Sequence, residues 1–281
     1  MNNSLNKNAG LLNKFTGFYF LTVIVLWLKT YFTQLTVFDL GVEGTFQHFL
    51  LFINPLGSAL LFLGLSFFSK GRRRYIWLMI FYTVMSIWLY ANVMYYRFFN
   101  DFITLPTILQ TQNFGDLGGS VVSLFQITDI LFFVDCFILI ALLAFKVIKV
   151  EKTVQPRKKA VAIITLALGF MCLNLGLAES DRPELLTRGF DRNYIVKYLG
   201  MYNFTIYDAV ESTKAASQRV LADSSDVTEV INYTQSNYAA PNEEYFGIAE
   251  GRNVVYLHLE SIQTFLMDYH LNGEEVMPFL N

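Results

Sequence analysis

Five long apolar runs restrict this chain to folds that cross a lipid bilayer. The chain has 281 residues, of which 54% are hydrophobic and only 16% are charged. Each run is about 20 residues long, the length that an α-helix needs to cross a hydrocarbon core of about 30 Å. We therefore predict an all-α polytopic membrane domain over residues 1–178. Its predicted spans are Phe15–Leu35, Phe46–Phe68, Tyr75–Tyr96, Ile127–Val147 and Ala160–Ala178.

The basic residues of the short loops predict the orientation of these spans. Lys and Arg precede the first run and follow the second and fourth runs, whereas residues 36–45 and 98–126 contain neither. Because cytoplasmic loops carry an excess of Lys and Arg, we predict a cytoplasmic N-terminus. Five spans then place residues 179–281 outside the cell. The basic residues that follow the fifth run do not alter this prediction, because long translocated domains escape the charge rule.

The charge distribution argues against a nucleic-acid partner, and the cysteine spacing argues against a metal site or a disulfide. The net charge is −2, with the basic residues in short loops and most acidic residues in the final third, so no nucleic-acid partner is expected. Cys136 and Cys172 lie inside apolar runs, without the spacing of a metal site or a disulfide. Both are predicted to be small core residues.

The predicted outer loop over residues 98–126 is unusually apolar and is broken by Pro and Gly. Such a loop lies in the membrane interface or re-enters the bilayer, where its backbone must be satisfied by protein or water. One interpretation is a short amphipathic helix that packs on the bundle. The other is a platform for lipid headgroups, in which Arg97 meets a phosphate and Asp101 is a further contact to lipid or substrate.

Two aspartates lie in the outer half of the predicted fourth span. Asp129 is close to the interface and is expected to be solvated. Asp135 lies about 9 Å deeper at 1.5 Å per residue, where a carboxylate is costly unless it is paired. The available cations are Lys29 and Arg97, so we favour a structural ion pair over a contact between Asp135 and lipid or substrate.

Residues 179–222 are predicted to form linker helices outside the membrane. The stretch from Pro183 to Thr213 is amphipathic, which suits a helix on the outer membrane surface or against the bundle. Val220-Leu221-Ala222 followed by Asp223 is the small-x-small pattern that signal peptidase cuts, so we predict cleavage after Ala222. The polar residues 223–252 are predicted to be an extended linker.

The chain then enters a short run of β-formers that ends in a carboxylate. Residues 253–259 are typical of a buried strand of a parallel sheet, with Glu260 at the carboxyl end where α/β sheets build their sites. A carboxylate there suits Mg²⁺ or Mn²⁺. The alternative is a helix cap or a surface charge, with Ser261 opening the next helix. Because partner strands are missing, residues 253–281 are expected to be the first strand and helix of an incomplete domain.

Several long segments resemble the lipoteichoic acid synthases of Gram-positive bacteria. The last segment, NVVYLHLESIQTFLMDYHLNGEEVMPFLN, resembles the opening of the extracellular domain of that family. Upstream, NYTQSNYAAPNEEYFGIAEGRN, ELLTRGFDRNYIVKYLGMYNFTIYD and YRFFNDFITLPTILQTQNFGDLGG extend the resemblance over most of the chain. The resemblance implies that an α/β external domain, alkaline-phosphatase-like and sulfatase-like, follows the membrane domain.

The resemblance also implies an activity. Enzymes of this family transfer glycerol phosphate from phosphatidylglycerol to a growing chain on a glycolipid anchor, using Mn²⁺ and a threonine nucleophile. Glu260 matches the family's first metal-ligand glutamate, whereas the nucleophile lies downstream, so this chain alone is expected to be inactive. Membrane lipids, signal peptidase and other cell-envelope proteins are expected partners. A lipoteichoic acid primase, a phosphoethanolamine-transferase-like or sulfatase-like relative, and a non-enzymatic lipid-binding membrane module remain open alternatives.

Overall fold

The computed structural model divides the chain into two compact units, Met1–Leu221 and Ala222–Asn281. The residues that the structure describes are 14–109, 124–148, 150–151, 156–187, 189–221, 224–259 and 263–279.

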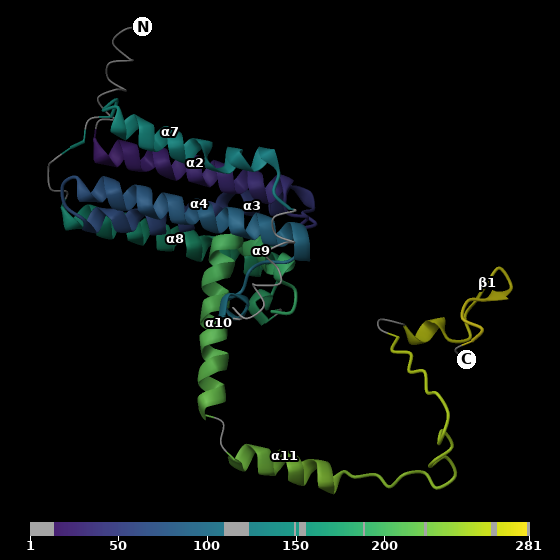
Figure 1. Cartoon of the computed structure of the whole chain (residues 1–281). Helices are drawn as coiled ribbons and strands as arrows, with labels where there is room; N and C mark the ends of the chain where they lie inside the picture. The colour runs from purple at the N-terminus through teal and green to yellow at the C-terminus, as the bar shows by residue number, and fades with distance from the viewer. Residues whose placement is uncertain are drawn as a thin grey trace. The chain divides into compact units, whose positions relative to one another are not determined.

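Five helices in the described part of the first unit are long and apolar enough to cross a membrane. They lie side by side as a bundle (Figure 1), and each corresponds to one predicted span, which confirms the prediction of five spans. They are α2 (Phe15–Thr36), α3 (Gly44–Gly64) continued by the 3₁₀ turn η1 (Leu65–Phe68), α4 (Arg73–Phe99), the 3₁₀ turn η3 (Ile127–Ile130) continued by α7 (Leu131–Ala144), and α8 (Arg157–Asp181).

The most extensive contact between two described helices joins α3 to α8, and small residues help to make it possible. A Cβ added to Gly57 of α3 would lie 2.8 Å from the side chain of Met171 on α8. Ala167, one turn earlier on α8, is fully buried. Small residues let helix backbones approach closely, which is how helices associate in lipid where no hydrophobic force drives them together.

The two ends of the bundle differ in charge. The end where α2, α4 and α8 begin is here called the basic end, because its exposed loops carry Lys and Arg. The opposite end is called the α9 end after the short helix α9 (Arg192–Leu199), which packs there against α3 and α8. The basic residues described at the basic end are Lys14, Lys70, Arg72, Arg73, Arg74, Lys146, Arg157, Lys158 and Lys159.

The stretch predicted as one amphipathic helix over 183–213 is broken in two at Gly200. α9 precedes the break and α10 (Met201–Leu221) follows it. Ile195, Val196 and Tyr198 of α9 are fully buried, so α9 packs against the end of the bundle, which is one of the two positions expected for this stretch. Two shorter elements, α5 (Leu105–Leu109) and η4 (Leu185–Thr187), complete the described part of the first unit at the α9 end.

The second unit contains little regular structure among its described residues. Helix α11 (Ser224–Ser236) occupies the first half of the segment predicted as an extended linker. The 3₁₀ turn η5 (Thr264–Leu266) follows, and then a hairpin of β1 (His270–Leu271) and β2 (Glu274–Glu275), which are antiparallel. Asn272 and Gly273 between them both have positive φ, as a tight Asn-Gly hairpin turn requires.

The buried strand predicted over residues 253–259 is not formed in this structure. These residues lie in no strand, and Tyr256 is 83% exposed. A strand exists only by hydrogen bonding to a partner, and no described segment pairs with this one. The helix expected after Ser261 is reduced to η5 among the residues that the structure describes.

Candidate functional site

The predicted contact residues Arg97, Asp101 and Asp135 each lie in a different ion pair. Arg97 pairs with Asp129, Asp101 with Arg192, and Asp135 with Lys29. Every pair joins side chains from two different segments of the chain, in the half of the bundle nearer the α9 end. The three residues are therefore engaged in holding elements together.

The Arg97–Asp129 pair is bidentate. The two guanidinium nitrogens of Arg97 donate to the two carboxylate oxygens of Asp129 at 2.8 and 2.7 Å. The hydroxyl of Tyr90 also donates to Asp129 at 2.9 Å, as does the backbone N–H of Gln126 at 3.0 Å. The expectation that Asp129 is solvated is wrong: the residue is only 5% exposed, because η3 turns its carboxylate toward α4. A lipid phosphate would have to compete with this carboxylate for Arg97.

The Lys29–Asp135 pair lies deeper in the bundle and joins three helices. The ammonium of Lys29 (α2) lies 2.7 Å from an Asp135 oxygen (α7) and donates to the hydroxyl of Ser86 (α4) at 2.7 Å. A third contact runs from Lys29 to the carbonyl of Phe132 at 3.2 Å, so all three ammonium donors are used. Tyr82 donates to the same Asp135 oxygen. The expected pairing of Asp135 is confirmed.

This pair matters most for α7. Among the residues of α7 itself, only Cys136 and Leu139 are buried. Because lipid is as apolar as the exposed Leu, Ile and Phe residues of α7, burial alone attaches this helix weakly to the bundle. The polar contacts of Asp135 and Asp129 with α2 and α4 therefore hold α7 in place.

Polar contacts also fix the segment that follows α4. Asp101 pairs with Arg192 at the start of α9. The amide of Asn193 donates to the carbonyl of Asn100 at 3.1 Å. Farther along, Asp208 of α10 accepts from the backbone N–H that opens α5 at 2.6 Å. This part of the predicted outer loop is therefore packed on α9 and α10, as the first of the two interpretations expects.

Tyr198 is the polar centre of the α9 contact. Its hydroxyl donates to Asp181 at 2.9 Å and accepts from Gln47 at 2.9 Å and from Arg182 at 3.2 Å. Burial, the largest cause, raises the pKa of Tyr198 to about 12, so the hydroxyl stays a donor at neutral pH. Asn174 of α8 donates to the Tyr198 carbonyl at 3.1 Å.

Lys197 makes a second polar contact beside Tyr198. Its ammonium donates to the Gly41 carbonyl at 2.7 Å, and burial lowers its pKa. The polar contacts around Tyr198 and Lys197 were not predicted from the sequence. The sequence feature that indicates them is the presence of Gln47 and Asn174 inside apolar runs, because polar side chains in a membrane helix hydrogen-bond across helices.

The predicted metal and cleavage residues have no described position. Glu260, Ala222 and Asp223 lie outside the described residues. Within the described part of the chain, no group of three or more His, Cys, Asp or Glu side chains is positioned to hold a metal ion. The described polar clusters provide attachment between helices.

These features define a polytopic helical membrane domain whose buried ion pairs hold its long helices together and whose hydrogen bonds attach α9 and α10 at one end. The family model "Lipoteichoic acid synthase N-terminal domain" matches residues 1–221. The chain belongs to the lipoteichoic acid synthase family and is a multi-pass membrane protein. No solved structure matches it significantly.

The curated relatives are considerably longer than this chain. Lipoteichoic acid synthase 2 of Bacillus subtilis (strain 168) is 53% identical and lipoteichoic acid synthase 1 of the same strain is 51% identical. Lipoteichoic acid synthase of Staphylococcus aureus (strain USA300) is 42% identical. In each comparison the match covers 94% of this chain and 41% of the relative. The chain thus spans less than half the length of the relatives it matches.

Proposed function

We propose that this chain is the membrane part, with the start of the extracellular domain, of a phosphoglycerol transferase that builds lipoteichoic acid from phosphatidylglycerol. The observation that carries the proposal is the identity of 42–53% with proteins named lipoteichoic acid synthase over nearly the whole chain. The transferase acts on a glycolipid anchor in the outer leaflet. The five helices anchor its extracellular domain to the membrane, and the ion pairs among them hold the bundle together.

The proposed orientation puts the basic end in the cytoplasm and the α9 end outside. We expect a Cys at position 70 to react with a membrane-impermeant maleimide only in opened cells, and a Cys at position 230 to react in intact cells. Both positions are tested in a background without Cys136 and Cys172. Labelling of position 70 in intact cells would reverse the orientation. Processing after Ala222 would be seen as a released fragment that begins at Asp223.

Glu260 is proposed as one ligand of a catalytic Mn²⁺, with Mg²⁺ as the other hard cation that a carboxylate accepts. When bound, the ion would polarise a phosphoryl oxygen and favour a threonine nucleophile from the part of the protein beyond residue 281. In a protein extended to the length of its relatives, Glu260→Ala should lower the Mn²⁺-dependent release of diacylglycerol from phosphatidylglycerol by more than about 100-fold.

A matched control for this test is Glu250→Ala, which removes another carboxylate from the same segment and should leave turnover unchanged. Undiminished turnover of Glu260→Ala would disprove the metal assignment. Products that carry a single glycerol phosphate would favour a primase. Release of phosphate esters by reaction with water would favour a hydrolase. Absence of turnover in the extended protein with every lipid donor would favour a non-enzymatic membrane module.

A further inference from the structure

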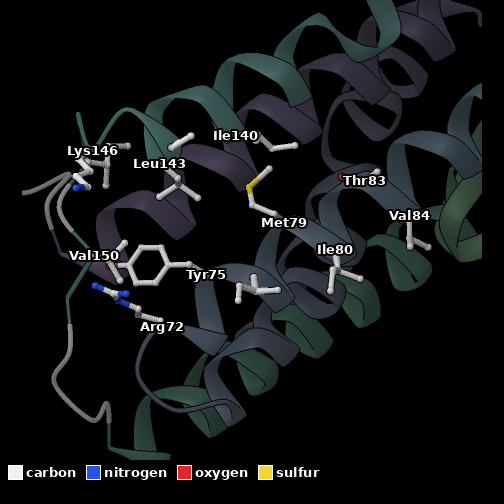
Figure 2. A pocket seen from close by; sticks show the side chains of 13 residues that line it. Arg72, Tyr75, Met79, Ile80, Thr83, Val84, Ile140, Leu143, Lys146 and Val150 are labelled. Atoms are coloured by element: carbon white, nitrogen blue, oxygen red, sulfur yellow. The ribbon is translucent and has the colours of Figure 1, made fainter.

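A groove between α4 and α7 at the basic end is not used by any of the interactions described above. Its cavity volume is about 850 Å³. The walls are mainly apolar, with Met79 of α4 pointing toward Ile140 and Leu143 of α7 and with Ile80 at the edge of the groove (Figure 2). The part of α4 that lines it runs from Tyr75 to Val84, a length of about 14 Å at 1.5 Å per residue. That is the shape and chemistry of a site for an extended hydrocarbon chain.

The groove is charged at one end. Arg72 and Lys146 belong to its lining and lie at the same end of it in Figure 2. Arg72 immediately precedes α4, and Lys146 follows the last residue of α7 by two positions. Both therefore lie where the helices leave the hydrocarbon, which is the level of phosphate headgroups.

The two cations differ from their neighbour Arg74. Arg74 is fully buried, and its guanidinium donates to the Glu151 carbonyl at 2.9 Å. Arg72 and Lys146 are exposed, and neither side chain makes a hydrogen bond or ion pair with another described residue. The nearby Glu151 carboxylate accepts from the backbone N–H of Phe15 at 3.0 Å. The mouth of the groove thus presents two cations that no described carboxylate pairs with.

We propose that this groove binds one anionic phospholipid from the membrane leaflet at the basic end. Its phosphate lies between Arg72 and Lys146, and one acyl chain lies between α4 and α7. The charge at the mouth selects an anionic headgroup over a zwitterionic one, and the apolar walls select a lipid over a soluble phosphate. The site does not depend on the proposed transferase activity, because it lies at the opposite end of the bundle from α9.

The test is native mass spectrometry of the purified 281-residue chain with phosphatidylglycerol or phosphatidylcholine of the same acyl chains. We expect one retained phosphatidylglycerol, bound about tenfold or more tightly than phosphatidylcholine. The double variant Arg72→Gln/Lys146→Gln should lose that preference. The matched control Arg73→Gln/Lys158→Gln removes two exposed cations from the same end that do not line the groove, and it should keep the preference.

A second pair of variants tests the acyl-chain walls. Val84 lines the groove, whereas Ile87 on the same helix does not, and the two are 57% and 52% exposed. Val84→Trp should lower lipid retention about tenfold, and Ile87→Trp should not. Equal retention of both lipids by the unmodified chain would overturn the proposal, as would equal losses in the Gln variants and their control. A lipid-free dimer mass that disappears in Val84→Trp would instead assign the groove to a second copy of the chain.

Discussion

Replacing Lys29 with Met should strongly destabilise the helix bundle. The substitution removes the ammonium that lies 2.7 Å from Asp135 and leaves a carboxylate inside the bundle without its counter-ion. Breaking a buried pair from one side costs about 3–5 kcal/mol of unfolding free energy. One oxygen of Asp135 is already buried without a hydrogen-bond partner among the described residues, so the hydrogen bond from Tyr82 to the other oxygen would be the main compensation left. We expect a lower thermal unfolding midpoint in detergent, measured by circular dichroism.

The double variant Lys29→Met/Asp135→Leu should recover most of that loss, because it removes both charges and fills their space with apolar groups. A control is Lys158→Met, which removes an exposed cation at the basic end and should change the free energy of unfolding by less than about 0.5 kcal/mol. If the Lys29→Met variant were as stable as the unmodified chain, or if the double variant were as unstable as Lys29→Met, the pair would not hold α7 as we infer.

The second large effect is expected from Gly200→Ala. Gly200 joins α9 to α10 with φ +81° and ψ 156°, a backbone conformation that is essentially restricted to glycine. A residue with a side chain pays about 1–3 kcal/mol there. A Cβ at this position would also lie 2.5 Å from the side-chain amide of Asn54, which is 1% exposed. We expect α9 to leave its place against α3 and α8, which limited proteolysis of the segment around residue 190 would detect.

Two further variants separate the causes of that effect. Gly169→Ala on α8 has nothing within 4 Å of the added Cβ and should be neutral or stabilise the helix by up to about 1 kcal/mol. Gly200→Ala/Asn54→Ala relieves the overlap but not the backbone strain, so it should recover only part of the stability. Full protease resistance of Gly200→Ala would show that the junction tolerates another backbone conformation.

The five spans were predictable because each is an uninterrupted apolar segment of the length of a bilayer core, a local property. The pairing of Asp135 was predictable from depth alone, because an unpaired carboxylate inside a bundle is costly. The burial of Asp129 was not predictable in this way. Its position near the interface indicated contact with water, but it is buried because η3 packs against Arg97, which is 32 residues away in the sequence.

The segment predicted as a buried strand also shows what composition alone cannot decide. Residues 253–259 have the composition of a buried strand, yet they are exposed and pair with no described segment. Composition describes what a segment would do beside partner strands, and it cannot supply them. The metal assignment of Glu260 therefore remains a prediction from resemblance.

The sequence by itself determined the class of this protein, because the length of the apolar runs, the charge of the loops and the long segments that resemble the family are all properties of the linear sequence. Only the tertiary structure decided which polar residues meet: Lys29 with Asp135, Arg97 with Asp129, and Tyr198 with Gln47 and Asp181. It also decided that α9 packs against α3 and α8 at one end of the bundle and that two cations flank an apolar groove. The physical reason is that such contacts depend on the rotation and mutual approach of helices, which long-range packing sets and local sequence does not.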